Sequence, residues 1–190
     1  QRLKLAKALA FSVQGNIKKS EDVLVEFSQE TAKEIVEPDV ISLWNFTNIL
    51  NKLYKQEWAN IKEDLYSVVT FANNYNDVLV KNLLKVFLGK ILQEEGNLSK
   101  ALDIFNEQVA VFAKEKIALG ALLCWYYIAK LTVVTEGSDK ALDIAQKALD
   151  VAKNPKISNY YFMVLYKKLI AEIFLIKGDT DASKMYIEKA

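Results

Sequence analysis

The stretch LGKILQEEGNLSKALDIF, residues 88–105, contains the signals for two helices and the turn between them. Apolar residues recur at helical spacing on both sides of Gly96, and glycine readily adopts the positive φ with which many helices end. The stretch therefore predicts one helix that stops before Gly96 and a second that begins near Leu98. Similar stretches precede and follow it, which indicates a chain built from repeats.

The repeat is clearest in the residue that follows each predicted turn by about five positions. These residues are Ser20, Ile61, Ala101, Ala141 and Ser183, spaced 41, 40, 40 and 42 residues apart. Four of the five are small, which allows two helices to approach closely. The pattern predicts an all-α fold of about five helix pairs with a period of about 41 residues, in a single domain over residues 1–190.

The expected helices are joined by short connections. They cover residues 3–13 and 18–36, 40–54 and 57–71, 78–94 and 98–113, 116–134 and 139–153, and 159–177 and 181–190. Pro38 should begin a helix, because proline is tolerated in the first turn. Ser138 and Ser158 are the expected N-caps. No glycine marks the turn at residues 54–57, and residues 73–77 form a polar turn.

Composition argues against several kinds of function. The net charge is only +1 and the chain has no histidine and one cysteine, Cys124. We therefore expect no nucleic-acid binding by this domain, no internal disulfide, no metal or cofactor site and no enzymatic activity. The longest apolar run, residues 117–129, is too short to span a bilayer and indicates a buried helix that includes Cys124. A cytoplasmic location without membrane insertion is the corresponding expectation.

The third repeat resembles a tetratricopeptide repeat at Leu88, Gly89, Leu92, Gly96, Leu98, Ala101 and Phe105. The first, fourth and fifth repeats support the resemblance, whereas the second matches poorly. The family's repeat typically has about 34 residues. The longer period is similar to that of the superhelical domain of maltose-activator-type regulators, or of an anaphase-promoting-complex subunit. HEAT-type repeats have the right length, but they do not require the pair Leu88 and Gly89 or the pair Ala101 and Phe105. They are therefore the second-ranked resemblance.

The resemblance implies a right-handed α-α superhelix whose concave groove is lined by the first helix of each pair and holds a protein or peptide. The groove residues that it implies are Phe46, Leu50, Leu83, Val86, Lys90, Tyr126, Lys130, Lys168, Glu172 and Leu175. Lys90, Lys130 and Lys168 come from successive repeats, and there are two interpretations of them: a clamp for a carboxylate, or solvated side chains without a shared role. Tyr126 or Tyr160 is expected on the groove wall unless both tyrosines serve the core.

The sequence is compatible with three functions. The leading hypothesis is a protein–protein interaction scaffold within a larger, bacterial assembly such as a flagellar, pilus or secretion apparatus. The alternative is a ligand- or peptide-sensing regulatory domain of a transcription or signalling protein, and an enzyme is the third. We expect the chain to be an excerpt of a longer protein. A homodimer through the C-terminal end is possible, because Met185, Tyr186 and Ile187 form an uncovered apolar face there.

Overall fold

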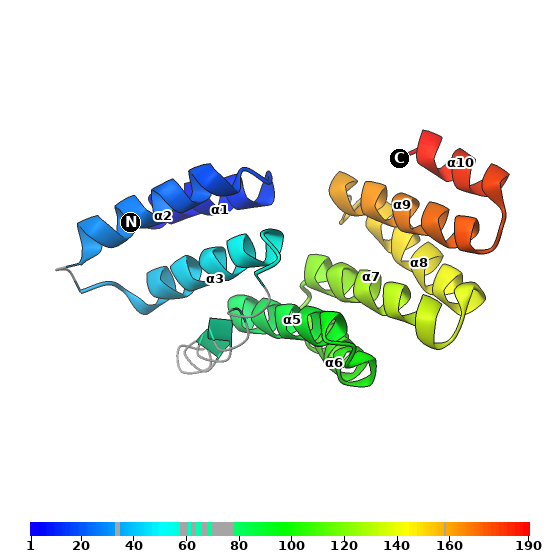
Figure 1. Cartoon of the computed structure of the whole chain (residues 1–190), viewed down its shortest axis with the longest axis horizontal. Helices are drawn as coiled ribbons and strands as arrows, with labels where there is room; N and C mark the ends of the chain where they lie inside the picture. Colours follow the sequence, from blue (N-terminus) through cyan, green and yellow to red (C-terminus); the bar gives the residue numbers. More distant parts are fainter. Residues whose placement is uncertain (33–34, 58–60, 62–63, 66–67, 70–77, 158) are drawn as a thin grey trace. The chain divides into compact units, whose positions relative to one another are not determined.

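A computed structural model describes residues 1–190 except 33–34, 58–60, 62–63, 66–67, 70–77 and 158 (Figure 1). The chain divides into two compact units, Gln1–Ile91 and Leu92–Ala190, which we call unit 1 and unit 2. Each unit is described by itself. The single domain expected from the repeat period therefore stays a prediction.

All regular elements in the described ranges are helices, which confirms the all-α fold. They are α1 (Arg2–Val13), α2 (Ile17–Thr31), α3 (Pro38–Tyr54), α5 (Val78–Glu94), α6 (Leu98–Lys114), α7 (Ala118–Thr135), α8 (Ser138–Lys153), α9 (Tyr160–Ile176) and α10 (Thr180–Glu188). Helix α3 begins at Pro38, as predicted. Helix α2 ends at Thr31 and not near residue 36, so that prediction was wrong. The helix expected at 57–71 and the turn at 73–77 lie largely outside the described residues.

The turns that join the helices of a pair share one backbone geometry. Gly15, Gly96 and Gly178 adopt φ values of 75°, 79° and 82°. After α5, Gly96 N donates to Gln93 O at 3.0 Å and Asn97 N donates to Leu92 O at 2.8 Å, which is the Schellman pattern. In the second repeat Gln56 takes the place of the glycine, with φ 58° and the same two bonds. The turn without a glycine is therefore built like the others.

The helix caps differ from the prediction in unit 2. Gly137, with φ 104°, is the N-cap of α8, and Ser138 is the first residue inside the helix, where its hydroxyl makes no capping bond. Helix α9 is capped by Asn159, whose Oδ1 accepts from Phe162 N at 3.1 Å. The other predicted cap, Ser158, lies outside the described residues. Glycine thus replaces a side-chain cap where the chain must turn sharply into α8.

Unit 1 buries two apolar clusters. One joins α1, α2 and α3 through Leu5, Ala8, Leu24, Phe27 and Val40. The other contains Phe46, Ile49, Ile61, Leu65, Val68, Leu84, Phe87 and Ile91. Phe46 stacks on Phe87 with ring centroids 5.4 Å apart, which ties α3 to α5.

A buried polar ring also holds α1, α2 and α3 together. Ser12 Oγ donates to Asn51 Oδ1 at 2.5 Å, and Asn51 Nδ2 donates to Ser20 Oγ at 2.9 Å. The two serine Oγ atoms lie 2.8 Å apart, which leaves Ser20 to donate to Ser12. All three side chains are almost completely buried. Because each member finds partners within the ring, the cost of burying these polar groups is largely offset.

Unit 2 is organised around α7, which contacts α6, α8 and α9. The contact with α6 is close, since the Phe112 ring fills the space in which a Cβ on Gly120 would lie. Buried alanines on α8 (Ala141, Ala145, Ala148 and Ala152) let that helix approach its neighbours. Cys124 is fully buried, as expected. Among the described residues α7 is the one helix long and apolar enough to cross a membrane, a property that the core helix of a folded unit shares.

Candidate partner-binding face

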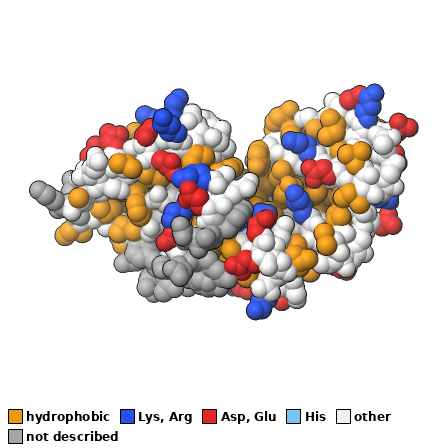
Figure 2. Space-filling model, viewed as in Figure 1, with side chains coloured by type: hydrophobic (Ala, Val, Ile, Leu, Met, Phe, Trp, Pro, Cys, Tyr) orange, Lys and Arg blue, Asp and Glu red, His pale blue; other side chains and the backbone are white. Residues whose placement is uncertain are grey.

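Within unit 2, the first helices of successive pairs lie against each other. Helix α7 contacts α9 directly, whereas no described residues of α6 and α8 come into contact. One half-buried to exposed stripe of each helix forms what we call the α7–α9 face. It consists of Tyr126, Lys130 and Val134 of α7 and of Tyr161, Leu165, Lys168, Glu172 and Leu175 of α9. Figure 2 shows hydrophobic side chains with basic and acidic groups between them over these helices.

Tyr126 lies at the centre of this face. Lys130 Nζ lies 5.6 Å from the centroid of its ring, within the range of a cation–π contact. The ring also meets that of Tyr166 edge-on, with centroids 6.2 Å apart. Burial raises the pKa of Tyr126 to about 12, and the nearby Glu172 and Tyr161 add to the rise. The phenol is therefore neutral at physiological pH and available as a hydrogen-bond donor.

The rest of the face is unusually open for apolar side chains. Val134 is 75% exposed, Tyr161 62% and Leu175 56%. Lys168 and Glu172 are exposed as well, and no ion pair in the described part of the chain engages either of them. Exposed apolar groups beside unpaired charges are typical of surfaces that meet another molecule.

Four of the groove residues predicted from the sequence lie on this face, and they are Tyr126, Lys130, Lys168 and Glu172. Leu175, from the wider set, lies there too. Tyr126, Lys130 and Glu172 are brought together by the contacts described above. The sequence pointed to Tyr160 as a possible wall residue. Instead, Tyr160 Oη donates to Ala190 O at 3.4 Å, and Tyr161 is the residue next to Tyr126. Tyr161 shares a helical stripe with Lys168 and Glu172, a signal that the sequence already contained.

The predicted groove residues of unit 1 have different surroundings. Val86 is fully buried and Phe46 is 8% exposed, so their assignment to an open groove was wrong. Phe46 belongs to the core because Phe87 stacks on it. Leu83 and Leu50 are half-buried and pack on the same cluster. Lys90 is half-buried in unit 1, whereas Lys130 and Lys168 belong to unit 2. A clamp of all three lysines therefore stays a prediction.

Comparison with known proteins supports the fold more than any particular function. No family model matches the chain. A curated relative, Exportin-7 of Dictyostelium discoideum, is 27% identical over 184 residues, which cover 88% of this chain but 17% of that protein. The chain thus spans about a sixth of the length of this relative.

Solved structures that resemble the chain are helical repeat proteins. Aspartyl phosphate phosphatase F of Bacillus subtilis superposes with a TM-score of 0.71 and 10% identity over 99% of this chain and 58% of its own. A kinesin light chain from Podosopora anserina with TPR-like repeats gives 0.65 and 12%, over 99% and 91%. A Rap protein complexed with Competence and Sporulation Factor gives 0.53 and 10%, over 99% and 63%. The fold is a tetratricopeptide-like helical repeat.

Proposed function

We propose that this chain is a protein-interaction scaffold and that its α7–α9 face binds a peptide segment of a partner protein. The observation that carries the proposal is the combination of exposed Val134, Tyr161 and Leu175 with charged side chains that have no ion-pair partner in the described structure. A helical repeat presents such a face on a rigid layer of helices, so little order has to be created on binding.

The charges on the face suggest the chemistry of the partner. Lys130 and Lys168 outnumber Glu172, so a segment with apolar side chains and at least one carboxylate fits best. Lys130 lies over the Tyr126 ring, which limits the positions that its ammonium group can take. A carboxylate bound there would also be in reach of the neutral Tyr126 hydroxyl as a donor.

The setting that we propose is a larger cytoplasmic assembly, without a catalytic role for this domain. Bacterial flagellar, pilus or secretion machines are the setting expected from the repeat type, whereas the partial likeness to Exportin-7 would suit a transport protein. A homodimer through α10 is a further proposal, since Met185 and Ile187 are 44% and 52% exposed there. Light scattering at several concentrations would test it.

A regulatory sensing domain is the second candidate. It is favoured by two structures with the same fold, the Rap protein complexed with Competence and Sporulation Factor and an archaeal signal-transduction ATPase with a tetratricopeptide repeat sensor. In that case the α7–α9 face would bind a free signal peptide, and occupancy would change the stability or association of the chain. The two candidates differ in the size of the ligand and in that response.

The test is a titration with an array of immobilised peptides that vary in apolar and acidic content. Peptides with a carboxylate and apolar side chains should bind. The double variant Lys130→Glu, Lys168→Glu should lower their affinity at least tenfold. Lys147→Glu is the matched control, because Lys147 is an exposed lysine of α8 that pairs with Asp143 away from this face. Equal binding by the double variant and the wild type would contradict the proposal.

A further inference from the structure

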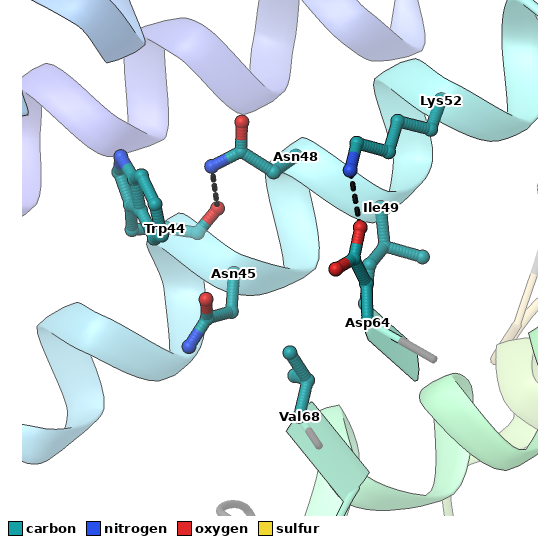
Figure 3. A pocket seen from close by; sticks show the side chains of 7 residues that line it. All are labelled: Trp44, Asn45, Asn48, Ile49, Lys52, Asp64 and Val68. Carbon is teal, nitrogen blue, oxygen red and sulfur yellow. Dashed lines mark hydrogen bonds and ion pairs between the residues drawn. The ribbon is translucent and has the colours of Figure 1, made fainter. Parts of the chain in front are cut away.

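A second surface, of different chemistry, lies in unit 1 along one side of α3. A pocket of about 300 Å³ is lined by Trp44, Asn45, Asn48, Ile49, Lys52, Asp64 and Val68 (Figure 3). A shallower depression of about 600 Å³ lies against α2 and is lined by Glu21, Leu24, Val25, Ser28, Gln29, Ala32, Trp44 and Asn48. Because Trp44 and Asn48 line both, we treat the two as one feature and call it the Trp44 trough.

The repeat shows how unusual the residues of this trough are. The later repeats place apolar residues at the position of Asn48, namely Leu88, Ile128 and Ile170. At the position of Trp44 they place Leu84, Cys124 and Tyr166, all of which are fully buried. Trp44 and Asn48 are only half-buried. The second repeat therefore has a carboxamide and a half-buried indole at positions where the three later repeats are apolar or fully buried, a choice that packing alone does not favour.

Several polar groups of the trough lack partners in the described structure. Asn48 Nδ2 donates to the carbonyl oxygen of Trp44 at 3.0 Å, which leaves its Oδ1 as an acceptor. The side chain of Asn45 makes no hydrogen bond to any described residue, and in Figure 3 it projects beside Val68. Trp44 Nε1 also lacks an acceptor, but it is buried and therefore out of a ligand's reach. The two asparagine side chains together offer donors and acceptors, which a peptide bond also carries.

The charges that line the trough are, by contrast, already neutralised. Lys52 pairs with Asp64 within the pocket (Figure 3). Glu21 pairs with Lys55 at 2.9 Å. A charged ligand would find no unpaired opposite charge among these residues, so the trough suits an uncharged one. Ile49 and Val68 add an apolar surface beside the amides.

We propose that the Trp44 trough binds an uncharged, extended peptide segment. The main chain of the segment exchanges hydrogen bonds with the side-chain amides of Asn45 and Asn48, beside the Trp44 ring. An aliphatic side chain of the segment packs on Ile49 and Val68 in the pocket, whose volume is at the lower end for ligand sites. This site is independent of the α7–α9 face and differs from it in using amides where that face uses charges.

The experiment titrates the whole chain, labelled with ¹⁵N, with a library of acetylated and amidated pentapeptides that contain only Ala, Val, Leu, Ser and Asn. The readouts are the indole N–H signal of Trp44, assigned with Trp44→Phe, and the side-chain NH₂ signals of Asn45 and Asn48. We expect some peptides of the library to shift these signals. The variant Asn48→Ile should lower the affinity of those peptides at least tenfold. Isoleucine is the residue that two other repeats carry at this position, so the variant should fold and melt no lower than the wild type.

Two controls make the result decisive. Lys130→Glu, in unit 2, should leave the binding of these uncharged peptides unchanged, so that failure of this site and failure of the α7–α9 face can be told apart. A library that shifts none of the three residues, or that binds Asn48→Ile as tightly as the wild type, would overturn the proposal. Binding limited to peptides with a free carboxylate would overturn it as well.

Discussion

The two units solve the same packing problem with different chemistry. In unit 1, the junction between the first two repeats is filled by the hydrogen-bonded ring of Ser12, Ser20 and Asn51. In unit 2, the equivalent junction between the last two repeats is filled by Val133, Ala141 and Ile173, which belong to one apolar cluster. The ring is buried, as are Ala141 and Ile173, whereas Val133 is half-buried. Neither chemistry is therefore required by the fold itself.

This difference predicts which substitutions lower the stability of each unit. An apolar junction is stabilised by close fit and loses stability when a side chain is removed. A polar ring depends on all of its members, since one missing partner leaves buried groups without hydrogen bonds. The following variants should separate the two dependences, beginning with the largest expected effect.

Removing a large ring from unit 2 tests its dependence on close fit. Phe112 is fully buried, and its ring fills the space beside Gly120. Phe112→Ala should lower the free energy of unfolding by about 3–5 kcal/mol, because it leaves a cavity that the two helices cannot close. Urea denaturation followed by circular dichroism measures the loss. Val134→Ala, on an exposed residue of α7, should change it by less than about 0.5 kcal/mol. Similar small effects of both variants would contradict a core held by fit.

Breaking the polar ring tests unit 1. Asn51→Ile should cost about 2 kcal/mol, because Ser12 and Ser20 each lose a buried partner. The triple variant Ser12→Val, Ser20→Ala, Asn51→Ile copies the chemistry of the unit 2 junction. We expect it to lie within about 1 kcal/mol of the wild type, since no buried polar group is left unpaired. If the three changes simply add, the ring does not act as a unit.

The sequence predicted the helices well but not which of their faces are covered. Helix α5 has the predicted bounds, Val78–Glu94, because both its spacing and the turn at Gly96 are local signals. Phe46 and Val86 share repeat positions with exposed Lys168 or half-buried Tyr126, yet they are buried. The register of a repeat identifies equivalent positions, but the size and chemistry of the neighbouring side chains decide whether a position is open. Phe87, which stacks on Phe46, is such a neighbour.

The same limit applies to the candidate sites. Tyr126, Lys130, Lys168 and Glu172 could be found from the register, because the resemblance assigns their repeat positions to the groove. The Trp44 trough could not be predicted, because Trp44 recurs at helical spacing with apolar residues of α3, a pattern that is typical of a core residue. The signal that was available is Asn48, a carboxamide at a position that is apolar in the later repeats. Whether Asn48 lines a pocket depends on tertiary contacts, which the sequence does not reveal.

Alkaline pH should distinguish the two units. In unit 2, burial raises the pKa of the Cys124 thiol from 9.0 to about 12, and it raises the pKa of Tyr166 as well. Unit 1 has no cysteine, and its one described tyrosine, Tyr54, is 49% exposed. The folded state holds these protons more tightly than the unfolded chain. Their contribution is therefore complete below about pH 9 and is lost as the pH rises towards the folded values.

The loss should reach about 1 kcal/mol for Cys124 at pH 10, because the unfolded thiol is then largely ionised while the folded one is not. Urea denaturation at pH 7 and pH 10 measures it. Cys124→Ala should remove this part of the pH dependence, and Tyr166→Phe should reduce the loss that remains above pH 10. A wild-type chain equally stable at both pH values would show that the thiol is not held in its protonated form.

The smallest effects should come from the turns, where the first and third repeats have a glycine and the second does not. Nothing lies within 4 Å of the Cβ that an alanine at Gly96 would carry, so Gly96→Ala tests the backbone alone and should cost about 1 kcal/mol at φ 79°. Gln56→Gly should act in the opposite sense by about 0.5 kcal/mol, because it relieves φ 58° but increases the freedom of the unfolded chain. Thermal unfolding of both single variants and of the pair measures these shifts. Opposite signs would show that the turn without a glycine is strained, whereas two losses would show that the Gln56 side chain stabilises its turn by contacts that glycine cannot make.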